Sequence, residues 1–137
     1  MKKGMLLAVL AALMITPAVA VAQGPPNPMP AYKVMYILRG TLSAYTAYDA
    51  GTQTPGSITI AVKYANYHGR ALRNQSLTFP VGARTMIVLN NGVTAIADGD
   101  RGIVKIKAPL RIPAADLLAT LQAKTARQII DNGPPLP

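Results

Sequence analysis

The chain lacks cysteine, tryptophan and glutamate, and it contains a single histidine, His68. Without cysteine it can form neither a disulfide bond nor a lipid-modified N-terminal cysteine, so packing alone must stabilise the fold. A zinc site needs several His or Cys ligands, and one histidine does not supply them. We therefore expect no metal and no cofactor.

The scarcity of acid–base groups argues against most enzyme classes. A Ser or Cys nucleophile needs a base held against it, usually a histidine, and only His68 is present. Glycoside hydrolysis uses two opposed carboxyl groups, but the five Asp residues are expected in turns and at a helix start. Asp98 and Asp100 offer oxygen ligands for Ca²⁺, although their loop lacks the further carboxylates of such sites. The sequence thus predicts a protein without enzymatic activity. The Asp residues are Asp49, Asp98, Asp100, Asp116 and Asp131.

The first 22 residues have the pattern of a secretory signal peptide. Lys2 and Lys3 precede an apolar run over residues 5–15, and Pro17 precedes two overlapping small-residue cleavage sites in residues 18–22. The apolar run is shorter than the roughly 20 residues that a spanning helix needs. We expect cleavage rather than an uncleaved anchor, so the mature chain should be secreted or lie in the periplasm or cell envelope.

The mature chain is expected to hold one domain between two Pro-rich ends. Residues 23–31 contain four Pro and predict an extended linker, and residues 132–137 predict a disordered tail. Residues 32–131 should form a single β-rich domain. Without Lys2 and Lys3, 12 Lys and Arg remain against 5 Asp, a net charge of +7. Such a charge attracts anionic polymers, namely wall glycan, teichoic acid or nucleic acid.

Alternation of apolar and polar residues with a period of two dominates this domain and predicts strands. Gly40 marks a bend or bulge in the first strand. Pro80 predicts that its own strand lies at a sheet edge. Turn signals rich in Gly and Asn separate the runs, which are residues 34–48, 57–67, 76–81, 84–89, 94–97 and 103–107.

Residues 112–122 change to helical spacing. Pro113 and Asp116 near the start, followed by three leucines on one face, favour a short amphipathic helix. Residues 126–131 either continue this helix or form a closing strand. We favour the strand because the β-branched residues Ile129 and Ile130 form only a short apolar run. The predicted fold class is mainly β, a small OB-like barrel or compact sandwich of about 5–6 strands with one short C-terminal helix.

Four segments carry a resemblance to a known kind of domain. They are RGTL at residues 39–42, GSITI at residues 56–60, Thr85 within an apolar strand, and GDRGIVKI at residues 99–106. Together they resemble small secreted bacterial domains of unknown function with an OB-like β-barrel, over about residues 34–108. The resemblance implies a small closed or half-closed barrel and no established chemistry, and it assigns no functional residues. The segment after Pro113 departs from the pattern.

The most distinctive polar cluster is NYHGR at residues 66–70, at the end of a predicted strand. Tyr67 offers a stacking face, and Arg70 and Arg73 offer forked donors for a sugar, phosphate or other anion. Loops at strand ends often carry binding residues. A polar hairpin end in which His68 is simply exposed is the alternative, and it stays open.

All six Tyr residues lie between residues 32 and 67, interleaved with Lys and Arg. Aromatic and basic side chains on one sheet face form a binding platform in OB-type domains. Tyr36 and Tyr64 share the apolar phase of their strands, so we expect both in the core. The candidate binding residues are Tyr45, Lys63, Tyr67, His68, Arg70 and Arg73.

Elimination leaves a non-enzymatic binding or accessory module for an anionic envelope or extracellular ligand as the favoured function. The alternative is a structural or assembly protein that docks a partner chain through a strand edge near Pro80 or through the helix around residues 117–121. An enzyme that combines Asp with Tyr or with His68 is the third hypothesis.

Overall fold

A computed structural model describes residues 32–137, so the predicted signal peptide (residues 1–22) and linker (residues 23–31) lie outside the described residues. The described chain forms strands, two short 3-10 helices and one short α-helix, which confirms a mainly β fold with one short C-terminal helix. In chain order the elements are β1 (Lys33–Thr46), β2 (Gly56–Ala65), η1 (Tyr67–Leu72), β3 (Ser76–Val81), β4 (Met86–Leu89), β5 (Arg101–Pro109), η2 (Ala114–Asp116), α1 (Leu117–Gln122) and β6 (Gln128–Asp131).

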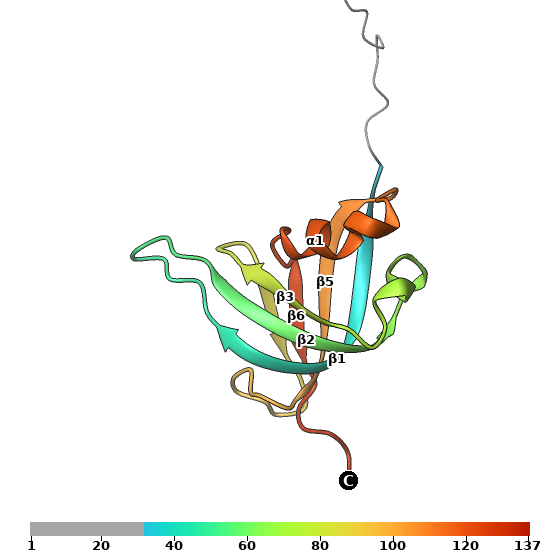
Figure 1. The fold of residues 1–137 in the computed structure, drawn as a ribbon. Helices are drawn as coiled ribbons and strands as arrows, with labels where there is room; N and C mark the ends of the chain where they lie inside the picture. The colour runs from blue at the N-terminus through green and yellow to red at the C-terminus, as the bar shows by residue number, and fades with distance from the viewer. Residues whose placement is uncertain (1–31) are drawn as a thin grey trace, which may run out of the picture. The chain divides into compact units, whose positions relative to one another are not determined.

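The strands form one sheet in the order β3-β2-β1-β5-β6-β4. All neighbours are antiparallel except β4 and β6, which run parallel. The sheet is not closed, and β3 and β4 are its edges. These two strands are consecutive in the chain and only residues 82–85 join them, so the sheet curls until its edges approach one another there, as the bent strands of Figure 1 illustrate.

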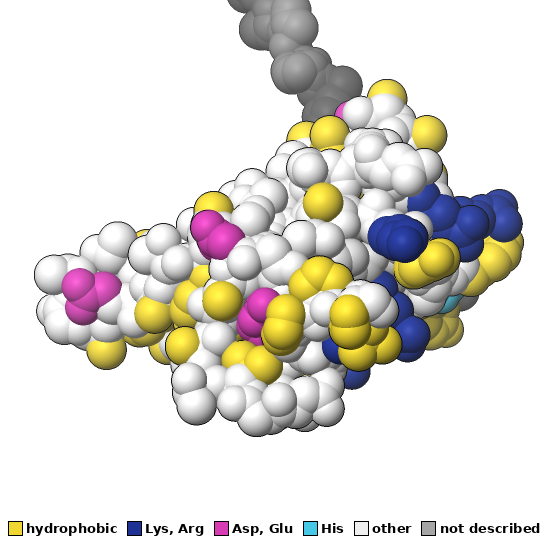
Figure 2. Space-filling model, turned by 90° about the horizontal axis from the view of Figure 1, so that it is seen from below, with side chains coloured by type: hydrophobic (Ala, Val, Ile, Leu, Met, Phe, Trp, Pro, Cys, Tyr) yellow, Lys and Arg dark blue, Asp and Glu magenta, His cyan; other side chains and the backbone are white. Residues whose placement is uncertain are grey.

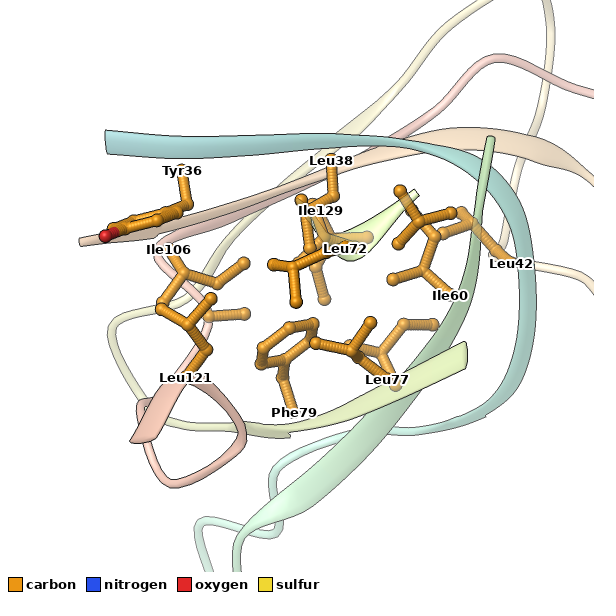
Figure 3. Packing of buried hydrophobic residues seen from close by; sticks show 14 of the residues in the cluster. Tyr36, Leu38, Leu42, Ile60, Leu72, Leu77, Phe79, Ile106, Leu121 and Ile129 are labelled. Carbon is orange, nitrogen blue, oxygen red and sulfur yellow. The ribbon is translucent and has the colours of Figure 1, made fainter. Parts of the chain in front are cut away.

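The core lies inside this curl. Alternate residues of a strand face the same side of a sheet, so the apolar phases of β1, β2, β3 and β5 meet there. Figure 3 shows the labelled side chains pointing toward one another within the curved strands. Helix α1 adds Leu121, which is fully buried. The buried hydrophobic residues are Tyr36, Leu38, Leu42, Ile58, Ile60, Val62, Leu72, Leu77, Phe79, Val81, Val104, Ile106, Ala108, Leu121, Ala126 and Ile129.

A β-bulge interrupts the pairing of β1 with β2. Arg39 lies opposite Tyr64, but the next residue, Gly40, lies opposite Val62, so Lys63 is the extra residue. A Cβ on Gly40 would collide with the carbonyl oxygen of Ala61, which explains the glycine. A bulge is thus found at Gly40, as predicted, but its extra residue lies in β2 and not in the first strand.

The bulge also reverses the inside–outside phase of β2. Tyr64 should follow Val62 into the core by simple alternation, but the extra residue turns it to the outer face, where it is 59% exposed. The prediction that Tyr64 is a core residue is therefore wrong. The same prediction for Tyr36 is confirmed, and its hydroxyl donates to the carbonyl oxygen of Pro109 at 3.0 Å.

Other expected elements are found with altered limits, and one is not. Pro80 lies in β3 at the sheet edge, as predicted, and residues 128–131 form the closing strand β6. Residues 94–97 form no strand. Asn91 and Gly92 adopt positive φ angles and turn the chain there, and the Ala97 N–H donates to the Asp131 carboxylate instead of to a neighbouring strand.

The residues after β6 are held against the start of β5. The Asn132 N–H donates to the carbonyl oxygen of Arg101 at 2.8 Å, and the Arg101 N–H donates to that of Gly133 at 2.8 Å. The beginning of the segment predicted as a disordered tail (residues 132–137) thus continues the pairing of β6 with β5. Within residues 32–137, no helix has the length and apolar character needed to cross a membrane.

Candidate functional site

An open depression with a volume of about 430 Å³ lies across β2, β1 and β5. Three cationic residues from three different strands line it, namely Arg39, Lys63 and Arg101. None of the described residues that line it is acidic. The other lining residues are Gly40, Thr41, Tyr64, Gly102, Ile103, Asn132 and Pro135.

Two glycines lie side by side where β1 meets β5 at this depression. Gly40 pairs directly with Gly102. A Cβ on Gly102 would collide with the Leu42 side chain and would lie 2.7 Å from the carbonyl oxygen of Ile130. The close packing of strands and core at this point therefore requires a bare backbone at both positions, and the cations stand around it.

The three cations differ in how firmly they are held. Arg101 is half-buried, its Nε donates to the carbonyl oxygen of Pro134 at 3.1 Å, and its Nη2 donates to that of Asn132 at 3.2 Å. A guanidinium has five N–H groups, so others remain for a ligand. Arg39 and Lys63 are exposed, and Lys63 Nζ lies 5.5 Å from the centroid of the Tyr64 ring, a cation–π distance.

A second hollow of about 180 Å³ adjoins the first. Ile37, Arg39, Tyr64, Ala65 and Asn66 line it. Because Arg39 and Tyr64 line both hollows, they form the ridge between them. The two hollows follow one another along the outer face, from the end of β6 to the start of η1.

Asn66 fixes η1 to β1. Its Nδ2 donates to the carbonyl oxygen of Met35 at 2.8 Å, and its Oδ1 accepts from the Ile37 N–H at 3.2 Å. The same oxygen accepts from the Gly69 N–H at 3.3 Å and caps the helix. Beyond the end of β2, the Asn66 side chain therefore makes the hydrogen bonds to the β1 backbone that a neighbouring strand would otherwise make. It also sets the position of η1.

Helix η1 presents an aromatic and basic cluster. Arg70 Cζ lies 4.5 Å from the centroid of the exposed Tyr67 ring, a close cation–π contact. The ring of His68 is half-buried and packs edge-on against Tyr67, with 5.6 Å between their centroids. On its other side His68 contacts the buried Tyr36 ring at 6.1 Å. His68 is thus an aromatic spacer between the core and Tyr67.

The structure brings together most of the residues that the sequence singled out, in two neighbouring groups. Lys63 lines the depression, and Tyr67, His68 and Arg70 form the cluster on η1, with the exposed Arg73 just after it. Tyr45 does not join them, because it is half-buried and packs against the core.

The candidate binding residues chosen from the sequence did not include Arg39, Tyr64 or Arg101, although Arg39 is one of the basic residues interleaved with the tyrosines. Tyr64 was missed because the predicted bulge was not used to reverse the inward-facing and outward-facing positions of the residues that follow it in β2. The signal was present, since Gly40 marks the bulge in the sequence. Arg101 lies in a predicted turn, and only the pairing of β5 with β1 places it beside Arg39 and Thr41.

The Asp49 side chain bonds within its own turn, as the sequence suggested, whereas Asp98 lies in a turn but bonds to the distant β1. Asp98 Oδ1 accepts from the Ala44 N–H at 2.9 Å, and Asp49 Oδ1 accepts from the Gly51 N–H at 2.9 Å. Hydrogen bonds from the Thr52 side chain and from the Gly51 and Thr52 backbone lower the pKa of Asp49. Within residues 32–137, His and Asp side chains do not gather in any group of three or more that could hold a metal ion.

Asp100 and Asp131 form a buried pair, and Arg101 follows Asp100 in the chain. Asp131 is fully buried and accepts from the Gly133 N–H at 2.7 Å and from the Ala97 N–H at 3.3 Å. Asp100 is 8% exposed. Burial raises the pKa of Asp100, as do its hydrogen bond with Asp131 and the charge of that residue, while Arg101 opposes the shift.

Charge is unevenly spread over the surface. In Figure 2 the Lys and Arg side chains gather toward one end of the visible face, and the acidic side chains lie apart from them.

No protein-family model, curated protein sequence or solved structure matches this chain. The geometry of the site is therefore the basis for inferring a function.

Proposed function

We propose that the protein is a non-enzymatic binding module for an extended anionic polymer, with phosphate or carboxylate groups repeated along its length. The observation that carries the proposal is the depression in which Arg39, Lys63 and Arg101 surround the exposed Tyr64 with no acidic residue lining it. Cations that converge from three strands attract an anion more strongly than the same charges scattered over a surface.

The shape of the site favours a polymer over a small molecule. The two hollows are open and are divided only by the ridge of Arg39 and Tyr64, so an extended chain that crosses this ridge can occupy both. Small-molecule sites are concave and enclose most of their ligand. Exposed Lys and Arg contacts are individually weak and screened by salt, so affinity has to come from several of them at once.

The aromatic rings add a second kind of contact. Tyr64 lies beside Lys63, and Tyr67 lies against Arg70, so each ring is paired with a cation. A base or sugar ring that stacks on either tyrosine would place its phosphate or carboxylate close to a positive charge. Wall glycan, teichoic acid and nucleic acid all have this chemistry in part.

We further propose that the protein acts outside the cytoplasm, secreted or in the cell envelope. The support is the basic, apolar and small-residue pattern of residues 1–22. Mass spectrometry of the protein from its native host should find a chain that starts at Val21 or Gln23. A full-length chain in the cytoplasmic fraction would contradict this part of the proposal.

The salt dependence of binding tests the site directly. Binding to heparin, teichoic acid and a single-stranded oligonucleotide would be measured for the chain and for Arg39→Gln with Lys63→Gln. The control, Lys124→Gln with Arg111→Gln, loses the same charge at exposed positions outside both hollows. On the single-stranded oligonucleotide the site variant should lower the slope of log affinity against log salt by about 1.4, which is about 0.7 for each lost cation, and the control should leave it nearly unchanged.

Equal losses in the two variants would mean that net charge, and not this site, attracts the polymer. No retention of the wild-type chain on any of the three ligands at low salt would overturn the proposal. The three ligands also distinguish the source of the anion, because only the oligonucleotide offers bases for Tyr64 and Tyr67 to stack on.

A further inference from the structure

The two edges of the sheet differ in whether another segment of the described chain covers them. At β3 the Thr78 N–H donates to Gln122 Oε1 of α1 at 2.9 Å, and the carbonyl oxygen of Pro80 accepts from the Ala126 N–H at 2.9 Å. Pro80 itself has no N–H. Helix α1 and the segment before β6 therefore occupy the edge that the sequence suggested for docking, and the buried Leu121 shows that the helix uses its apolar face internally.

The edge formed by β4 has no such cover among the described residues. Its strand neighbour is β6, and the flanking bonds run from the Met86 N–H to the Arg127 carbonyl oxygen and from the Asn90 N–H to that of Asp131. In a parallel ladder every second residue turns both backbone groups to the same neighbour. Met86, Val88 and Asn90 thus face β6, whereas Ile87 and Leu89 direct their N–H and C=O groups to the open edge.

The side chains of β4 are also unusually apolar for an edge. Met86 is 59% exposed, and Ile87 and Leu89 are each 37% exposed. Edge strands normally carry a Lys, a Pro, a bulge or a covering segment that prevents pairing with another chain. None of these is found in β4. The strand thus offers both free backbone groups and apolar surface to an added strand.

The absence of charge around β4 favours a second copy of the chain as the source of the added strand. Residues 85–97 contain no charged side chain, in a described chain that has 12 Lys and Arg against 5 Asp. A second copy carries the same positive excess, so two copies approach most easily where neither is charged. A two-fold axis also requires the two strands to run antiparallel, with one surface patch meeting itself.

We propose that β4 pairs antiparallel with β4 of a second copy and joins the two sheets into one. The free groups fix the register: Ile87 of one copy lies opposite Leu89 of the other in hydrogen-bonded pairs, and the two-fold axis passes between the two Val88 residues. Strand β6 lies between this edge and β5, which is the nearest strand of the depression, so the added strand does not pair with any strand that lines the depression. The proposal does not depend on the proposed function.

Molar mass as a function of concentration tests the dimer. Light scattering and sedimentation should show the wild-type chain passing from monomer to dimer, and Ile87→Lys should weaken the dimer about tenfold or more, because it places two like charges at the joint. Ser76→Lys adds the same charge on the β3 edge and should leave the dimer intact. Circular dichroism and thermal unfolding would establish that each variant is folded.

A disulfide cross-link tests the register without adding charge. The chain has no cysteine, and the two Val88 residues would form a non-hydrogen-bonded pair with Cα atoms about 4.5 Å apart, within disulfide range. Val88→Cys should therefore give a covalent dimer under mild oxidation that a thiol reverses, whereas Ser76→Cys should cross-link at least about tenfold more slowly.

Three results would overturn the proposal: a wild-type chain that stays monomeric at every concentration, equal effects of Ile87→Lys and Ser76→Lys, or equal cross-linking of the two cysteine variants. A strict monomer would leave the β4 edge to a strand from a different protein. Loss of the dimer with retained polymer binding would separate this proposal from the proposed function.

Discussion

Arg39 lies directly opposite Tyr64 across β1 and β2, and the extra residue Lys63 is what brings them together on the outer face. With the simple alternation of an unbroken strand, Tyr64 would point into the core and the ridge between the two hollows would be lost. The bulge therefore does more than bend the sheet, because it converts an apolar position into the centre of the candidate site.

Replacing Tyr64 should weaken binding without unfolding the protein. The ring is mostly exposed, so Tyr64→Ala should change the free energy of unfolding by less than about 0.5 kcal/mol. If a base stacks on the ring, its loss should cost about 1–3 kcal/mol of oligonucleotide binding, measured by titration calorimetry. Tyr32→Ala, at an exposed tyrosine outside both hollows, is the matched control. Identical affinities for the two variants would exclude a stacking role for Tyr64.

Asn66 should be important for stability as well as for the position of η1. Asn66→Ala removes the acceptor for two backbone N–H groups and the donor to Met35, and should lower the free energy of unfolding by about 1–3 kcal/mol. Asn66→Asp keeps the acceptor and loses only the donor, so its free energy of unfolding should lie between those of the wild-type chain and Asn66→Ala. Urea unfolding measures the order of the three chains, and an Ala variant as stable as wild type would contradict the capping role.

The glycine at the meeting point of β1 and β5 should tolerate no side chain. Gly102→Ala places a methyl group against Leu42 and the Ile130 backbone, and overpacking of this kind costs about 1–3 kcal/mol. Gly51→Ala is the control, because its nearest neighbour is the exposed end of the Asp49 side chain at 3.3 Å. We expect a lower urea midpoint for the first variant and little change for the second. Equal midpoints would show that the backbone relaxes around the new methyl group.

The buried pair predicts a loss of stability as pH rises. The pKa of Asp100 is raised in the folded chain, so the folded state keeps a proton that the unfolded state has already lost. This contribution is fully present below the ordinary aspartate pKa of about 3.9 and disappears as pH rises through the higher pKa of the folded chain. The lowered pKa of Asp49 has the opposite sign and acts below the ordinary value.

Asparagine cannot ionise, so the free energy of unfolding of Asp100→Asn should decline less with rising pH than that of the wild-type chain. Urea unfolding from about pH 4 to about pH 7 would measure it, with Asp116→Asn as a control at an exposed helix start. The control should follow the wild-type curve. If Asp100→Asn also followed it, the decline would have to come from another group.

The sequence predicted local features that depend on neighbouring residues. Alternation placed Tyr36 in the core, the glycine predicted an irregularity at Gly40, and the proline predicted an edge at Pro80; each is found. Apolar periodicity and turn residues act over a few positions, so a single sequence contains them. The strand expected at residues 94–97 is wrong because Ala97 is held by Asp131, a contact that no local pattern encodes.

The site was only partly predictable for the same reason. Lys63 and the cluster of Tyr67, His68 and Arg70 stand close together in the chain, and they were found. Arg101 joins Arg39 only through the pairing of β5 with β1, and this pairing brings together residues about 60 positions apart. Predicting the outward position of Tyr64 required both the bulge and its effect on the direction of the residues that follow it.

The parallel partnership of β4 and β6 has a consequence for how the molecule is made. Gln128 and Met86, which begin the two strands, are 42 residues apart in the chain. Until residues 128–131 have left the ribosome, β4 lacks its partner strand β6, and pairings between such distant segments form slowly. Completion of the fold should therefore be a late event, and a chaperone that shields residues 86–89 in the meantime would raise the yield of native protein.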